Sequence, residues 1–294
     1  MIRYLMLFII SALPVVLICW FVYSKDRNKE PIQLLSTLFI KGIASCFLVL
    51  VVSEFMELLI PFLGKEVVDM TQFEVLIYSF VGVALVEEAC KWYFVHKVGY
   101  NSRCFDEKYD IIVYAVFVSL GFAFFENMLY VFTNNSIKIG ISRALLAVPG
   151  HACDSIFMGY YLTIAKQAHL DGNKDQEKLN KIKSILVPTI LHGIYDFCLF
   201  INMDEFMYVF FIFIIFLYVA SLSKIKQLSR KNKSLYRTQL KKEYRNRIKN
   251  SRMDNYIERE RMQQINMTNS DKEYCTNCGT ILVGPFCMHC GKRK

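Results

Sequence analysis

The stretch DIIVYAVFVSLGFAFFENMLYVF, residues 110–132, is an apolar run with one acidic residue, Glu126, in its interior. A helix needs about 20 such residues to cross the hydrocarbon core of a bilayer. Six other runs have similar lengths, at 4–23, 34–53, 73–95, 141–165, 184–203 and 205–223. Only residues 202–205 separate the last two runs, so six or eight spans also remain possible. The sequence predicts an all-α, polytopic transmembrane helix bundle of about seven spans.

Basic residues gather in alternate loops, which predicts the orientation of the chain because such loops face the cytoplasm. The loops after the second and fourth runs hold little beyond Lys65 and Lys138. The loops after the first, third and fifth runs hold Lys25, Arg27 and Lys29, then Lys97, Arg103 and Lys108, then five lysines between residues 166 and 183. We expect a multi-pass protein with its N-terminus outside and its C-terminal tail in the cytoplasm.

The charge of the chain lies in its tail. Residues 1–223 hold 17 Lys and Arg against 20 Asp and Glu, whereas residues 224–261 hold 14 against 4. We predict a transmembrane domain at 1–223, a basic cytosolic linker or helix at 224–270, and a small C-terminal module at 271–294. A basic segment beside a membrane is typical of contact with anionic lipid, so we expect the lipid bilayer, and not nucleic acid, as its partner.

The C-terminal module contains two Cys-x2-Cys pairs, each followed by glycine. Four thiolates at this spacing are typical of a tetrahedral, structural zinc site, here a zinc ribbon. Two disulfides are the alternative, which the expected cytosolic side disfavours because thiols stay reduced there. Four cysteines would fill all four positions of the zinc ion, so the module is expected to bind a cytosolic protein partner and not to catalyse a reaction. The predicted zinc ligands are Cys275, Cys278, Cys287 and Cys290.

Eight acidic, basic or imidazole side chains fall in the interior of the four central runs, beyond the first turn of each. Each costs about 2.5–3.5 kcal/mol at the bilayer centre on an insertion scale, so they should face inward and meet one another. Their spacing agrees, since Glu87 and Glu88 precede Lys91 by four and three residues, and His192 precedes Asp196 by four. The eight residues are Glu87, Glu88, Lys91, Glu126, His151, Asp154, His192 and Asp196.

Such a cavity suits peptide hydrolysis, in which a carboxylate takes a proton from water and imidazoles hold a zinc ion or stabilise the oxyanion. Asp196 could orient His192. Transporters and buried polar packing networks also place charges inside membranes, and Pro149 and Pro188 could break helices as in transporters. From the residues alone, a hydrolase, a transporter and a non-catalytic membrane scaffold all stay open.

Four motifs, in order, resemble those of the PrsW-type intramembrane protease family, a relative of the CAAX-protease and bacteriocin-immunity superfamily. Residues 26–31 resemble its charged segment after the first span, and the resemblance covers roughly residues 20–220. The four motifs are Glu87-Glu88-Ala-Cys-Lys91, Phe122-Ala-Phe-Phe-Glu126-Asn127, His151 with the downstream Met158-Gly-Tyr-Tyr, and His192-Gly-x-Tyr-Asp196.

The resemblance implies a peptidase of a bacterial plasma membrane that cleaves membrane-anchored proteins, of which a single-span anti-sigma factor is the known type. We expect Glu87 to activate the water, and Lys91 to adjust the carboxylates. Glu88 and Glu126 would assist or bind metal, and His151 and His192 would bind metal or the oxyanion. An active-site zinc would be held by His151, His192 and Glu126, although the glutamates alone are the alternative. The ribbon lies outside the region of resemblance.

Overall fold

The computed structural model describes residues 2–201, 203–230, 235, 253, 256, 258–261, 273–280, 282 and 285–293. The chain divides into two units, Met1–Tyr236 and Arg237–Lys294, which we describe separately. Most of the predicted linker at 224–270 lies outside the described residues. The domain boundaries drawn from the sequence stay predictions.

All the regular secondary structure that the model describes in the first unit is helical. The long helices are α1 (Ile2–Lys25), α2 (Ile32–Leu59), α5 (Asp110–Thr133), α7 (Ala147–Leu170), α8 (Lys174–Phe200) and α9 (Asp204–Arg230). The shorter helices are α3 (Gln72–Ile77), α4 (Val86–Phe94) and α6 (Ile137–Leu145). Four tighter or wider helical stretches complete the unit: η1 (Pro61–Gly64), η2 (Val67–Asp69), and the π-helical η3 (Tyr78–Leu85) and η4 (Val95–Tyr100).

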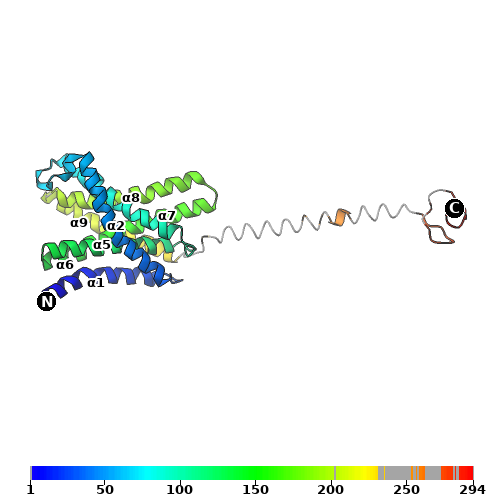
Figure 1. Cartoon of the computed structure of the whole chain (residues 1–294), viewed down its shortest axis with the longest axis horizontal. Helices are drawn as coiled ribbons and strands as arrows, with labels where there is room; N and C mark the ends of the chain where they lie inside the picture. The colour runs from blue at the N-terminus through cyan, green and yellow to red at the C-terminus, as the bar shows by residue number, and fades with distance from the viewer. Residues whose placement is uncertain are drawn as a thin grey trace. The chain divides into compact units, whose positions relative to one another are not determined.

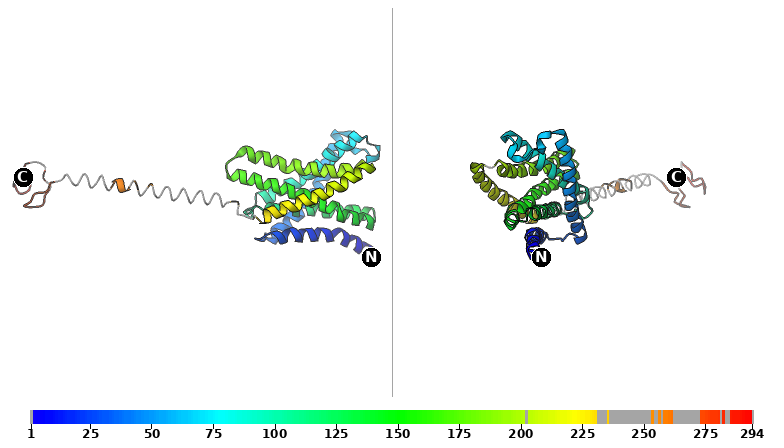
Figure 2. Two further views of the ribbon diagram at one scale, coloured as in Figure 1. Left: turned by 180° about the vertical axis from the view of Figure 1, so that it is seen from behind. Right: turned by 60° about the vertical axis from the view of Figure 1, so that its left-hand side comes forward.

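Helix α5 forms the centre of the bundle. It packs against α1, α2 and α7, and α7 packs in turn against α8. Of the most apolar part of α5, 72% is buried, against 22–39% for the other helices long and apolar enough to cross a membrane. Figures 1 and 2 show α1, α5 and α7–α9 running along the bundle, with α2 crossing obliquely. A residue on α5 therefore has protein on several sides.

Two glycines bring α2 and α5 into backbone contact. A Cβ atom added to Gly42 would lie 2.0 Å from the carbonyl oxygen of Val118, and one added to Gly121 would lie 2.0 Å from that of Phe39. Small residues at helix interfaces permit such close approach in membranes. This contact fixes the position of α5 next to the residues described below.

The membrane prediction is confirmed in its class, because the fold is that of an all-α, polytopic membrane protein. By length and composition, five helices of the described region can cross a membrane: α1, α2, α5, α8 and residues 204–229 of α9. Helix α7 carries His151 and Asp154, and residues 72–94 are divided between α- and π-helical segments. The count of seven spans stays a prediction.

The two prolines considered as helix breakers do not act as such. Pro188 lies inside α8, which runs from Lys174 to Phe200 without interruption. Pro149 lies in the first turn of α7, where the missing N–H would have no helical partner in any case. The irregular helical stretches are instead the π-helical η3 and η4, which directly precede and follow α4.

The basic loops of this unit meet at one end of the bundle. The Asn28 amide donates to Glu107, the Thr163 hydroxyl donates to the carbonyl of Lys108, and the Lys166 ammonium donates to the carbonyl of Tyr100. The loops after α1 and before α5 and the last turns of α7 are thus neighbours.

Candidate active site

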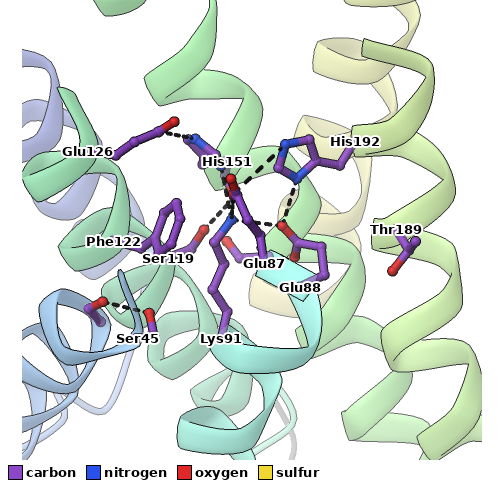
Figure 3. Close-up of polar contacts among 12 residues, drawn as sticks. Ser45, Glu87, Glu88, Lys91, Ser119, Phe122, Glu126, His151, Thr189 and His192 are labelled. Atoms are coloured by element: carbon purple, nitrogen blue, oxygen red, sulfur yellow. Dashed lines mark hydrogen bonds and ion pairs between the residues drawn. The ribbon is translucent and has the colours of Figure 1, made fainter. Parts of the chain in front are cut away.

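Four helices bring the predicted acids, imidazoles and lysine together at the middle of the bundle (Figure 3). Helix α4 supplies Glu87, Glu88 and Lys91, and α5 supplies Glu126. Helices α7 and α8 supply His151 and His192, respectively. The charged side chains of α4 lie in a short segment, and all three are buried. The expected convergence of ionisable residues is therefore present.

Lys91 lies at the centre of this group. Its ammonium donates to Glu87 Oε2 at 3.1 Å and to Glu88 Oε1 at 2.8 Å, and it lies 3.1 Å from His151 Nδ1. It also lies 4.1 Å from the centroid of the Phe122 ring, close enough for a cation–π interaction. The contacts with Glu87 and Glu88 are those predicted from the four- and three-residue spacings. One buried cation thus balances two buried carboxylates.

The hydrogen bonds fix which nitrogen of each imidazole donates. An ammonium has only donors, so His151 Nδ1 accepts from Lys91, and His151 Nε2 donates to Glu126 Oε2 at 2.9 Å. Glu88 Oε1 accepts from Lys91, and His192 Nδ1 lies 3.0 Å from the same oxygen. An ionised carboxylate only accepts, so His192 donates through Nδ1. The ring centroids of the two histidines are 5.3 Å apart.

The second nitrogen of His192 faces two carboxylates. His192 Nε2 lies 3.3 Å from Asp196 Oδ2 and 3.9 Å from Glu87 Oε2. Asp196 lies one turn beyond His192 on α8, as the sequence predicted. The Nε2 atom of His192 therefore faces the carboxylates of Glu87 and Asp196.

Arg143 of α6 is a member of the site that the sequence did not indicate. Its Nη2 atom lies 2.6 Å from Glu126 Oε2, and its Nε atom donates to Asn127 Oδ1 at 3.1 Å. Its guanidinium carbon lies 4.0 Å from the centroid of the Tyr130 ring. An arginine near the start of the apolar run 141–165 was the available signal. Arg143 and His151 together hold the Glu126 carboxylate.

A cavity of about 210 Å³ opens beside these groups. Glu87 lines it, whereas Glu88 and Lys91 do not. Asp154 also lines it, is buried, and has a carboxylate oxygen, Oδ1, without a hydrogen-bond partner in the described part of the chain. The polar residues around the cavity are Tyr78, Glu87, Glu126, Tyr130, Arg143, His151, Asp154, His192, Tyr195 and Asp196. The cavity thus gives a substrate or a water molecule access to one carboxylate of α4.

The donor atoms of the site suit a metal ion. Glu87, Glu88, His151 and His192 each offer one ligand atom, and these four atoms lie within 4.8 Å of one another. Imidazole nitrogens with carboxylate oxygens are the ligands of many hydrolytic zinc sites. Glu126 is not in this group, although it contacts His151. In the structure the Lys91 ammonium supplies positive charge among these donors.

The second unit holds the four predicted cysteines in two matching turns. Cys275 Sγ lies 3.5 Å from Cys290 Sγ, and Cys278 Sγ lies 3.4 Å from Cys287 Sγ. All four are free thiols, with ligand atoms within 4.8 Å of one another. The glycine after each pair, Gly279 or Gly291, has a φ of +73°, which favours glycine and lets the chain turn around the sulfurs. This cluster can hold a metal ion.

Comparisons with known proteins place these residues in a family. Residues 30–220 match the family described as PrsW family intramembrane metalloprotease. A protein named Protease PrsW from Clostridioides difficile (strain 630) is 32% identical over 240 residues, covering 80% of this chain and 97% of the relative. The cysteine cluster lies beyond the matched range.

Two further relatives carry the same name. Protease PrsW of Oceanobacillus iheyensis is 34% identical over 227 residues, covering 76% of this chain and 96% of the relative. Protease PrsW of Bacillus subtilis (strain 168) is 34% identical over 206 residues, covering 70% of this chain and 87% of the relative. No solved structure matches the chain.

Proposed function

The chain belongs to the PrsW family of intramembrane metalloproteases and is an intramembrane protease; from this premise we propose which residues carry out the hydrolysis. The observation that carries the proposal is the position of Glu87. It lines the cavity next to two histidines, and the buried ammonium of Lys91 is its hydrogen-bond donor.

Glu87 is the proton acceptor for the attacking water. Glu88 accepts hydrogen bonds from Lys91 and His192, and Glu126 pairs with Arg143 and His151, so neither carboxylate is free to take a proton from water. Glu87 holds one hydrogen bond from Lys91 and faces the cavity. It takes a proton as the water oxygen attacks the peptide carbonyl carbon, and it gives that proton to the amide nitrogen as the C–N bond breaks.

His192 stabilises the negative charge that develops on the carbonyl oxygen, whereas both ring nitrogens of His151 are engaged by Lys91 and Glu126. His192 is held through Nδ1 by Glu88, which leaves Nε2 directed toward Glu87 and Asp196. Asp196 and Glu88 thus fix the orientation of this ring, and Glu126 and Lys91 fix that of His151. Donors held in place before the reaction stabilise an oxyanion most effectively. Lys91 keeps the two carboxylates of α4 in position.

We also propose that the site holds zinc. His151 and His192 would be its ligands, with a carboxylate from Glu88 or Glu126. When bound, the metal would polarise the peptide carbonyl and lower the pKa of a water molecule. A second, structural zinc ion would be held by Cys275, Cys278, Cys287 and Cys290.

Zinc counting on the full-length protein tests both metal sites. The parent should carry two zinc ions per chain. A variant with Cys287→Ser and Cys290→Ser should carry one and still cleave, because these cysteines are not among the residues that line the cavity. A variant with His151→Ala and His192→Ala should also carry one, and it should not cleave. One zinc in the parent and none in the active ribbon variant would show that hydrolysis proceeds without a metal.

The substrates follow from the place of the cavity. An intramembrane protease acts on membrane proteins in a lipid environment. We propose that this one cleaves membrane-anchored proteins, such as single-span anti-sigma factors, in a bacterial plasma membrane. The ribbon would contact a cytosolic protein partner, since its four cysteines leave no open position for a substrate.

We propose that the N-terminus lies outside and the C-terminal tail inside. The proposal rests on the basic loops, which meet at one end of the bundle through contacts such as Lys166 with Tyr100 and Thr163 with Lys108. Reporter fusions after residue 223 should be active in the cytoplasm, whereas fusions in the turn after Phe200 should be active outside. The reverse pattern would overturn this orientation.

A further inference from the structure

Three buried carboxylates form a second cluster at the end of the bundle where the basic loops meet. Asp26 directly follows α1, Glu30 lies just before α2, and Asp110 is the first residue of α5. Each offers one oxygen, and these oxygens lie within 4.8 Å of one another. Asp26 is 3%, Glu30 6% and Asp110 0% exposed. Residues 84 positions apart in the sequence thus share one buried acidic site.

Part of this cluster is hydrogen-bonded, which holds it in place. Asp110 Oδ2 accepts from the backbone amides of Asp106 and Glu107 at 3.1 and 2.7 Å. Glu30 Oε2 accepts from the Tyr114 hydroxyl at 2.5 Å. These hydrogen bonds fix the positions of the Asp110 and Glu30 carboxylates.

The remaining oxygens have no partner. Both carboxylate oxygens of Asp26 and the Oδ1 atom of Asp110 are shielded from solvent and lack hydrogen bonds within the described residues. Buried polar atoms are rarely left in this state unless a water molecule or an ion satisfies them. Three such atoms, all on carboxylates that face one another, favour a ligand of positive charge at this place.

The neighbouring cation does not satisfy them. The Lys29 ammonium donates to the backbone carbonyls of Tyr23 and Asp26, at 2.5 and 2.8 Å, and it forms no ion pair with the cluster in the described part of the chain. Burial is the largest cause of the shifts and raises the pKa of Asp26 to about 6 and that of Glu30 to about 7. Lys29 and the backbone amides of Arg27 and Asn28 lower the pKa of Asp26, whereas Glu107 raises the pKa of both carboxyls.

We propose that Asp26, Glu30 and Asp110 bind one hard divalent cation, of the Mg²⁺, Mn²⁺ or Ca²⁺ class, which joins the α1–α2 connection to the first turn of α5. Carboxylate oxygens without imidazole or thiolate are the ligands that these ions prefer. Two ligands on opposite sides of such an ion lie about 4–5 Å apart, which matches the spacing of the oxygens.

This cation site is separate from the hydrolytic one. Asp110 and Glu126 both belong to α5, and 16 residues of helix separate them by about 24 Å. The cation would offset most of the negative charge of the three carboxylates and fix the N-terminal end of α5. Its effect should therefore appear in cation binding and in stability.

Mn²⁺ binding to the full-length protein in nanodiscs of zwitterionic lipid tests the proposal. Electron paramagnetic resonance of free Mn²⁺ should show one more bound ion in the parent than in a variant with Asp26→Asn and Asp110→Asn. Mg²⁺ or Ca²⁺ should displace this ion. The controls Asp69→Asn, at an exposed aspartate, and Glu87→Gln, in the cavity, should retain it. Equal binding by the parent and the double variant would overturn the site.

Thermal unfolding gives a second measurement that does not depend on the double variant. At 100 times the dissociation constant, Mg²⁺ or Ca²⁺ should raise the unfolding midpoint of the parent by roughly 5 °C relative to buffer without added Mg²⁺ or Ca²⁺. Glu30→Gln keeps an oxygen for Tyr114 and should weaken Mn²⁺ binding at least tenfold. An unfolding midpoint of the parent that does not change with Mg²⁺ or Ca²⁺ would contradict the proposal. So would a Glu30→Gln variant that binds Mn²⁺ as tightly as the parent.

Discussion

Replacing Glu87 by glutamine should lower the rate of substrate cleavage by about 10²–10⁴-fold, the range expected for loss of a general base. Glutamine has nearly the same shape, and its carbonyl oxygen can still accept the hydrogen bond that Lys91 donates to Glu87 Oε2. It cannot take a proton from water. The variant should therefore insert and fold like the parent while losing turnover.

Cleavage of candidate single-span substrates in cells that carry each variant is the measurement. Glu54→Gln is a matched control, because Glu54 is an exposed carboxylate on α2, away from the cavity. It should cleave at the parent rate. If Glu87→Gln cleaved as fast as Glu54→Gln, Glu87 would not be the base, and the mechanism proposed here would be wrong.

Replacing Lys91 by alanine should destabilise the folded protein by about 3–5 kcal/mol, the cost of removing one partner from a buried ion pair. Lys91 is fully buried, and its ammonium contacts Glu87, Glu88 and His151. Without it, two buried carboxylates on successive positions of α4 would repel each other. The amount of folded protein recovered from membranes, and its resistance to thermal unfolding, should both fall.

Two comparisons separate loss of charge balance from loss of side-chain volume. Lys97→Ala removes an exposed lysine just beyond α4 and should have little effect. Adding Glu88→Gln to Lys91→Ala removes one uncompensated carboxylate and should restore part of the stability, although not the activity. A double variant less stable than Lys91→Ala would show that Lys91 does not act by balancing these acids.

Contacts within one helix could be predicted from the sequence. Lys91 lies four residues after Glu87, and Asp196 lies four after His192, so the helical repeat alone places each pair together. The meeting of Glu126 with His151 was expected from energetics, because charges inside a membrane must face one another. Both kinds of contact are present.

Contacts that depend on turns and crossing angles could not be predicted. Arg143 reaches Glu126 from the short helix α6, whose direction is set by the turn before it. Asp110 meets Asp26 because α5 is packed against α1. The change to π-helical hydrogen bonding at η3 leaves no mark in hydrophobic periodicity.

The polar lining of the cavity has a consequence for how a substrate is presented. In an α-helix each carbonyl oxygen already accepts a hydrogen bond from the amide four residues on. We expect a substrate segment to reach the Glu87 carboxylate with its own helix locally unwound, so that its amide groups are released from one another inside the bilayer. Unsatisfied amides are costly in lipid, and the polar groups around this cavity are positioned to receive them. The ease with which a membrane helix unwinds would then determine where it is cut.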